Sequence, residues 1–130
     1  MKFHLSSNRV ESLEIKPIES REENKNRFNF TSKCVFNESA PNEFVIKFDF
    51  DLTSDEGFIM FLKHDFIFHT DEAVSDEFLK SHYPSVNAPA IAYPYLRAFV
   101  STVLHNAGLG SVTLPAINFV EHAKKNKPSE

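Results

Sequence analysis

The clearest pattern in the chain is a strict alternation of apolar and polar residues over positions 43–52. Successive side chains of a β-strand point to opposite faces, so this alternation predicts a strand with one buried side. The apolar side consists of Phe44, Ile46, Phe48, Phe50 and Leu52. A shift of one residue would expose all five, so only one register is compatible with a buried core.

Three further segments have the character of strands, at positions 10–18, 27–36 and 58–69. Turn-forming residues at 37–43 and 53–57 separate the strands at 27–36, 43–52 and 58–69. Short connections of this kind join antiparallel neighbours. The pattern therefore predicts four strands, three of them in an antiparallel meander.

The segment 58–69 differs from the others because both of its sides are apolar. One side carries Phe58, Met60, Leu62, Phe66 and Phe68, and the other carries Ile59, Phe61 and Ile67. An antiparallel strand with one solvated face would alternate, so this strand is expected to be covered on both faces or to expose an apolar patch.

Positions 88–107 predict a helix that is apolar almost all the way round. Its only ordered polar line is Arg97, Ser101 and His105, spaced at i, i+4 and i+8. Such a helix needs cover on more than one side. A chain of 130 residues is too small to wrap this helix and also build the sheet, so we expect a second copy to supply the missing cover.

Local signals define the ends of this helix. Asn87 and Pro89 are typical of a helix start, and Gly108 and Gly110 are typical of a helix end. The chain is then expected to be extended before a short terminal helix at 120–125.

The composition predicts one globular domain spanning residues 1–130, with 42% apolar and 25% charged residues. Ten of the 14 phenylalanines fall in the strand-like region, which indicates a sheet face filled with phenylalanine. Residues 27–87 carry five basic against eleven acidic residues. This balance argues against nucleic-acid binding through the sheet.

Candidate chemistry is weak. The six histidines are not spaced to share a metal with a neighbouring acid. Cys34 lies on the apolar side of its strand and is expected to be a small buried hydrophobe, while Asp49 and Asp51 belong to a solvated sheet face. With no phosphate loop or nucleophile motif, we expect no cofactor and no enzymatic activity.

The chain has no apolar signal-peptide core and no run of about 20 apolar residues that could span a membrane. Its single cysteine cannot form an internal disulfide, which suits a reducing compartment. We therefore expect a cytoplasmic protein.

Residues 89–119 resemble the C-terminal part of the SecB family of export chaperones. The family's Phe-Pro-Tyr-Ala-Arg corresponds to Tyr93-Pro94-Tyr95-Leu96-Arg97. Its closing Leu-Ala-Pro-Val-Asn-Phe corresponds to Leu114-Pro115-Ala116-Ile117-Asn118-Phe119. The strand FIMFLK is also similar to the family's fourth strand in pattern and position.

The resemblance implies an α+β fold with a four-stranded antiparallel sheet, a long helix and a short terminal helix. It implies subunits that pair into dimers, and two dimers that form a tetramer with the long helices between two sheets. Members of the family hold non-native polypeptides without ATP and pass secretory precursors to the translocase motor SecA.

The resemblance also suggests roles for individual residues. Residues expected between copies of the chain are Phe58, Met60, Leu62 and His64 on the strand, and Tyr95, Phe99 and Val103 on the helix. The aromatic candidates for client contact are Phe28, Phe30, Phe61 and Tyr93.

Two positions depart from the family pattern. Pro17 and Phe61 stand where the family has acidic residues associated with docking on SecA. Holding of clients is therefore better supported than delivery to SecA. The alternatives are a specialised chaperone of one partner, such as an antitoxin, and an oligomeric binding module without catalytic activity.

Overall fold

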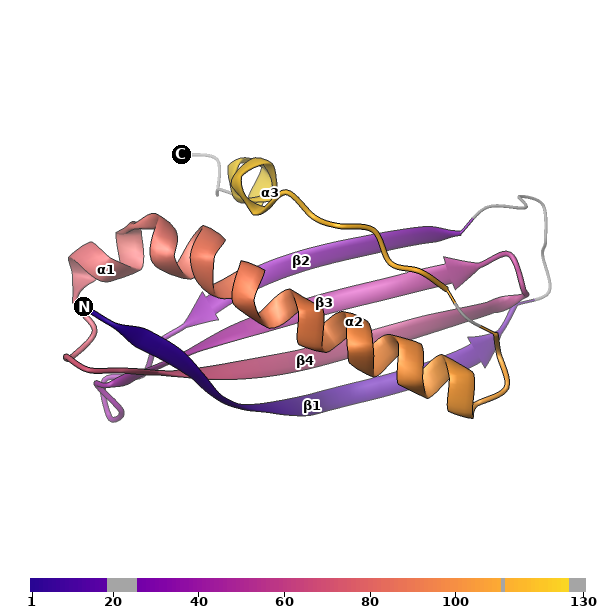
Figure 1. The fold of residues 1–130 in the computed structure, drawn as a ribbon, viewed down its shortest axis with the longest axis horizontal. Helices are drawn as coiled ribbons and strands as arrows, with labels where there is room; N and C mark the ends of the chain where they lie inside the picture. The colour runs from indigo at the N-terminus through magenta and orange to yellow at the C-terminus, as the bar shows by residue number, and fades with distance from the viewer. Residues whose placement is uncertain (19–25, 111, 127–130) are drawn as a thin grey trace.

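The computed structural model describes residues 1–18, 26–110 and 112–126. One antiparallel sheet carries all the helices on one face, which we call the inner face (Figure 1). In chain order the elements are β1 (Phe3–Pro17), β2 (Arg27–Val35), β3 (Glu43–Ser54), β4 (Phe58–Thr70), α1 (Asp76–Lys80), the π-helical turn η1 (Tyr83–Asn87), α2 (Ala88–Asn106) and α3 (Phe119–Asn126). The predicted α+β fold with a four-stranded sheet is confirmed.

The strand order is β1-β4-β3-β2, so β2, β3 and β4 form the predicted meander and β1 lies at the far edge beside β4. In β3 the side chains alternate between fully buried and partly exposed along the whole strand. The register between β3 and β4 places Phe50 opposite Leu62 and Phe44 opposite Phe68. The inner face is therefore a continuous apolar surface.

β1 begins at Phe3, seven residues before the predicted start. Its pairing with β4 shifts between Leu5 and Ser7 and again between Val10 and Ser12. A bulge of this kind adds a residue to one strand and breaks the alternation of sides. The first half of β1 therefore lacks the pattern by which strands are recognised in a sequence.

α2 begins at Ala88, as predicted, with Pro89 in its first turn, but the chain before it is already helical. Asn87 has helical backbone angles and its side chain makes no cap hydrogen bond. The preceding turn η1 continues directly into the helix, because the Ala88 N–H donates to the Tyr83 carbonyl. At the other end the prediction is confirmed, since Gly108 and Gly110 have φ values of 73° and 81°.

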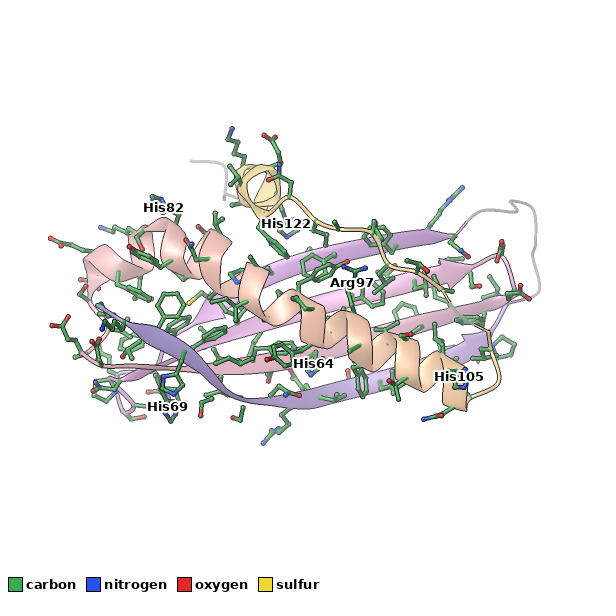
Figure 2. The ribbon with its side chains drawn as sticks, in the orientation of Figure 1. His64, His69, His82, Arg97, His105 and His122 are labelled. Carbon is green, nitrogen blue, oxygen red and sulfur yellow. The ribbon has the colours of Figure 1, made fainter. Side chains whose placement is uncertain are left out.

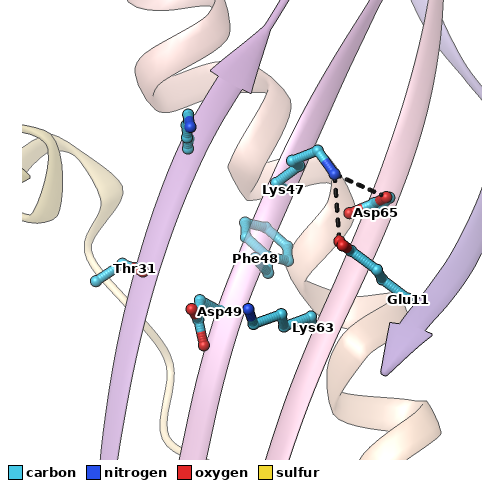
Figure 3. A pocket seen from close by; sticks show the side chains of 8 residues that line it. Glu11, Thr31, Lys47, Phe48, Asp49, Lys63 and Asp65 are labelled. Carbon is cyan, nitrogen blue, oxygen red and sulfur yellow. Dashed lines mark hydrogen bonds and ion pairs between the residues drawn. The ribbon is translucent and has the colours of Figure 1, made fainter. Parts of the chain in front are cut away.

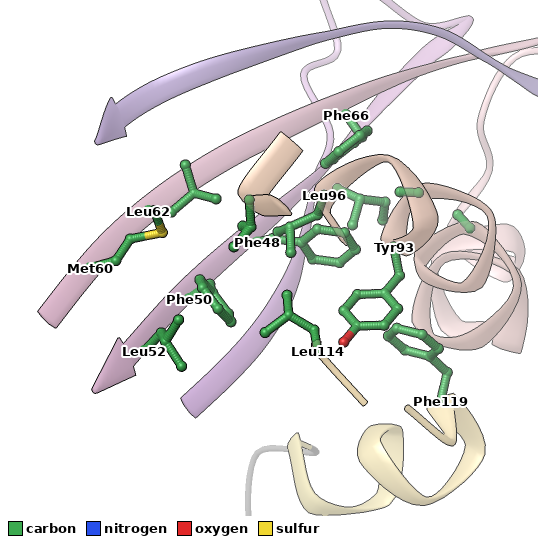
Figure 4. Close-up of a cluster of buried hydrophobic side chains, with 14 of the residues drawn as sticks. Phe48, Phe50, Leu52, Met60, Leu62, Phe66, Tyr93, Leu96, Leu114 and Phe119 are labelled. Carbon is green, nitrogen blue, oxygen red and sulfur yellow. The ribbon is translucent and has the colours of Figure 1, made fainter. Parts of the chain in front are cut away.

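The core lies between the inner face and α2. In α2 the buried residues recur at helical spacing and include Ala92, Leu96, Val100 and Leu104. Figure 4 shows Leu96 and Tyr93 of the helix approaching the phenylalanines of β3 and β4. After α2, residues 112–119 return along the inner face toward β2 (Figure 1). We call this segment the strap.

Candidate functional site

Four residues expected between copies of the chain lie instead inside the subunit. Phe58, Met60, Leu62 and His64 all point to the inner face, and none is more than 3% exposed. Their own chain covers them, so a second copy cannot reach them directly in this conformation. Their part in assembly stays a prediction, and it would be indirect, through the helix that they support.

His64 is the largest buried polar side chain of this region. Its Nε2 lies 3.1 Å from Oδ1 of Asn8, and no partner is present for its Nδ1 among the described residues. The ring also contacts Phe66 and Phe99, with centroids 4.3 Å and 5.3 Å away. Burial lowers the pKa of His64, and the nearby charge of Asp65 opposes this only in part.

We expect acid to destabilise the fold through His64. In the unfolded chain His64 has the ordinary histidine pKa of about 6.5, so it binds a proton more readily there than in the folded chain. The stability from neutral His64 is therefore complete above about pH 6.5 and is lost as the pH falls below that value. In urea unfolding at about pH 7.5 and about pH 5, His64→Leu should lose less stability on acidification than the wild type.

His105→Gln is the control, because it removes an exposed imidazole from the same side of the fold. It should lose as much stability on acidification as the wild type. An equal loss in His64→Leu and in the wild type would show that other groups cause the acid sensitivity.

An aromatic cluster lies where β2, α2 and α3 meet, and we call it the β2 cluster. It consists of Phe30, Tyr93, Phe119 and His122. The Phe30 ring is central, with centroid distances of 5.5 Å to Tyr93, 6.0 Å to Phe119 and 5.1 Å to His122. Phe30 and His122 are half-buried, while Tyr93 and Phe119 are buried. Since no strand of the described ranges pairs with the far side of β2, these rings lie beside an open sheet edge.

The structure brings two of the four client-contact candidates together and separates another. Phe30 and Tyr93 contact each other in the β2 cluster. Phe28 is two residues earlier on the same side of β2 and reaches Phe50, with ring centroids 6.4 Å apart. Phe61 lies on the other face of the sheet, is 42% exposed, and has the Lys16 Nζ 5.9 Å from its ring centroid.

The outer face of α2 forms a second apolar surface. Tyr95 is 55% exposed and Ile91 is 43% exposed. Phe99 and Val103 are half-buried along the side of the same helix. Its only residues with basic side chains are Arg97 and His105, and it has no acidic residue. In the single chain Ile91 and Tyr95 are open to solvent, and cover of this face by a second copy stays a prediction.

The fold is similar to that of a SecB-like chaperone. The structure of the Mycobacterium tuberculosis SecB-like chaperone Rv1957, in complex with a ChAD peptide from the antitoxin HigA1 (Rv1956), matches with a TM-score of 0.69 over 88% of this chain and 87% of that chain. The sequence identity is 14%, so the likeness is one of fold. A Streptococcus agalactiae protein of unknown function matches with a TM-score of 0.61 at 15% identity, over 89% of this chain and 98% of that one.

No protein-family model matches the chain, and no curated protein matches its sequence. The relation to SecB-like chaperones is therefore distant and rests on the fold. The α+β class, the four-stranded antiparallel sheet and the two predicted helices all agree with this neighbour.

The middle of the outer face of the sheet is charged, whereas Ile59, Phe61 and Ile67 of β4 make another part of this face apolar. Lys47 lies 3.2 Å from carboxylate oxygens of both Glu11 and Asp65 (Figure 3). The hydrogen bonds to Asp65 and Glu11 raise the pKa of Lys47, so it stays charged at neutral pH. These three residues line a shallow hollow of about 330 Å³ together with Thr31, Lys33, Phe48, Asp49 and Lys63. Both signs of charge meet here, so this hollow is a poor surface for an apolar segment.

The described residues offer little for catalysis. Burial raises the pKa of the Cys34 thiol to about 11, so the thiol is protonated at neutral pH and is not a nucleophile. The labelled histidines are dispersed over the fold (Figure 2), and no three metal-ligating side chains of the described ranges meet as a group. None of the helices in these ranges is long and apolar enough to cross a membrane.

Phe119 and His122 were missed as members of the site. The sequence showed Phe119 only as the last residue of a family-like motif, and no local pattern connects it to Phe30. The contact arises because the strap returns α3 to the edge of the sheet after α2 has ended. A long-range contact of this kind has no periodic signal in one sequence.

Proposed function

We propose that this protein is an ATP-independent SecB-like chaperone that holds extended apolar segments of non-native polypeptides in the cytoplasm. The observation that carries the proposal is the β2 cluster beside an open sheet edge. Edge strands present unpaired N–H and C=O groups with which an extended chain can pair. Aromatic rings next to that edge add apolar contact with few rotatable bonds.

The affinity expected between this surface and an apolar client segment is compatible with holding a client. Covering about 100 Å² of apolar surface contributes about 2.5 kcal/mol before ordering costs. One segment on one subunit would thus be held weakly. Several segments of the same client bound to several subunits would be held more tightly, because each later contact is intramolecular.

We propose that copies of this chain assemble through the outer face of α2, as a dimer of dimers. Tyr95 and Ile91 are exposed, and Phe99 and Val103 are half-buried beside them, so the chain leaves an apolar surface without acidic residues partly open. The proposal agrees with the tetramer that the family resemblance implies. It also gives the nearly all-apolar helix the second layer of cover that its sequence requires.

A second candidate is a dedicated chaperone of one partner. The M. tuberculosis neighbour was solved with a peptide from an antitoxin, which favours this narrower role. Delivery of clients to SecA has less support, because Pro17 and Phe61 stand at two acidic positions of the family. Rescue of export in cells lacking the general chaperone would favour the export role, and failure of that rescue with retained holding would favour a dedicated partner.

The aggregation of a chemically unfolded client tests the proposal directly. The wild-type protein should slow aggregation without nucleotide at near-equimolar ratios. Phe30→Ala should raise the concentration needed for half-maximal protection about tenfold, since it removes the central ring of the β2 cluster.

Phe61→Ala is the matched control, because it makes the same change on the opposite face of the sheet. It should protect the client as well as the wild type. No protection by the wild-type protein would refute the function, whereas loss of protection in Phe61→Ala alone would move the client surface to the outer face.

A further inference from the structure

The strap lies on the inner face as a bound peptide would. Its side chains alternate irregularly between contact and solvent: Leu114 and Phe119 are buried, and Val112 and Ile117 are half-buried. The remaining strap residues, Thr113, Pro115, Ala116 and Asn118, are exposed. No strap residue carries a charge. The strap is thus an uncharged segment that runs outside helices and strands over 112–118, ends at the first residue of α3, and is attached through four apolar side chains.

The backbone of the strap is held far more weakly than that of a strand. Residues 112–117 make no backbone–backbone hydrogen bond to the sheet within the described ranges. Among the described residues, their polar tether is the Tyr93 hydroxyl, which donates to the Pro115 carbonyl at 2.6 Å. Pro115 itself has no N–H to offer. Side-chain contact and one hydrogen bond from α2 therefore keep the strap in place.

The surface under the strap, which we call its seat, is formed by the sheet and by the β2 cluster. Leu114 points toward Phe50 and Leu52 of β3 and belongs to the same buried cluster (Figure 4). Phe119 contacts Phe30 and Tyr93, with ring centroids 6.0 Å and 5.6 Å apart. If the strap left, it would uncover an apolar surface continuous with the β2 cluster.

Local structure at both ends of the strap defines the segment that could move. Gly108 and Gly110 precede it with positive φ values of 73° and 81°, which glycine adopts without strain. At the far end, Asn118 Oδ1 accepts hydrogen bonds from the N–H groups of Val120 and Glu121 and so caps α3. Opening needs few interactions to break, which is typical of segments that open locally.

We propose that the strap occupies a client-binding site of its own chain. Polypeptide segments with the same pattern of apolar residues displace the strap and bind in its seat. The fitting class is an uncharged extended segment with apolar residues at i, i+2, i+5 and i+7, the last of them aromatic. This inference rests on the proposed function. It adds to that function the sequence preference for client segments and the segment of the chain, the strap, that competes with them. When the strap is closed in most molecules, the apparent dissociation constant for a client equals the intrinsic constant divided by the fraction of molecules in which the strap is open.

A labelled peptide with the sequence of residues 112–119, capped at both ends, is the probe. Its dissociation constant is measured by fluorescence anisotropy with the full chain. Leu114→Ala weakens the strap but leaves its seat intact, so this variant should bind the peptide at least tenfold more tightly than the wild type. The same peptide with alanine in place of its leucine should lose this gain.

Two further variants keep the test decisive. Gly110→Ala removes no buried side chain and strains the closed strap through its positive φ, so it should tighten peptide binding about fivefold. Thr113→Ala changes an exposed neighbour of Leu114 and should bind as the wild type does. If Leu114→Ala does not fold, the dissociation constant of the peptide for Gly110→Ala tests the inference in its place.

Equal peptide affinity in the wild type and in the folded strap variants would overturn the inference. The same preparations are tested for protection of an unfolded client. Protection by the wild type with equal peptide affinities would refute the strap inference alone. Absence of protection in every preparation would refute the proposed function, and the strap inference with it.

Discussion

Leu96→Ala is expected to lower the free energy of unfolding by about 3 kcal/mol. Leu96 is fully buried in the middle of α2 and faces the phenylalanines of the sheet. Alanine is a better helix former than leucine, so the local helix is not weakened. The loss comes from apolar contacts and from the cavity left between helix and sheet. Urea unfolding followed by circular dichroism measures it.

Leu13→Ala is the matched control, because it makes the same chemical change on the edge strand β1, where the side chain is 39% exposed. We expect it to lower the free energy of unfolding by less than about 1 kcal/mol, as partly exposed side chains bury less surface. Similar losses in both variants would mean that α2 does not pack on the sheet as described.

Tyr95→Lys is expected to break the assembly into smaller species. Tyr95 is the most exposed large apolar side chain of α2, and the face around it has no acidic residue to pair with a new lysine. An unpaired charge buried between two copies costs several kcal/mol. Light scattering coupled to gel filtration should show a lower mass for the variant than for the wild type at micromolar concentration.

The control for this experiment is Phe61→Lys, which places the same charge on the outer face of the sheet. Phe61 is already exposed near Lys16, and the middle of that face carries charges of both signs. We expect its mass to equal that of the wild type. A monomeric wild type, or an unchanged mass in Tyr95→Lys, would contradict assembly through the outer face of α2.

Local periodicity was sufficient to predict most of the fold. The alternation in β3 defined its buried side, and the apolar run of α2 together with Gly108 defined a helix and its end. The first half of β1 was not predictable, because its two bulges break the alternation. The start of α2 at Ala88 was predicted, but the π-helical turn η1 that runs into it was not, because no local pattern marks it.

The candidate site was harder to predict, because it depends on which elements meet. Phe61 was correctly placed on the opposite side of its strand from Met60. Only the registers of β2 with β3 and of β3 with β4 show that this side is also opposite to the face carrying Phe30. In the same way, the inward side of β4 is apolar in any case, and the sequence alone does not say whether α2 or a second copy covers it. The structure assigns the cover to α2 and the strap.

The central claim is that this protein recognises polypeptides because they are unfolded. It is tested most directly by measuring its affinity, in nucleotide-free buffer, for one labelled protein in two forms. One form is permanently unfolded by reduction and alkylation of its disulfides, and the other is native. We predict micromolar or tighter binding of the unfolded form and no detectable binding of the native form. Equal affinity for both forms, or no binding of the unfolded form, would contradict the claim.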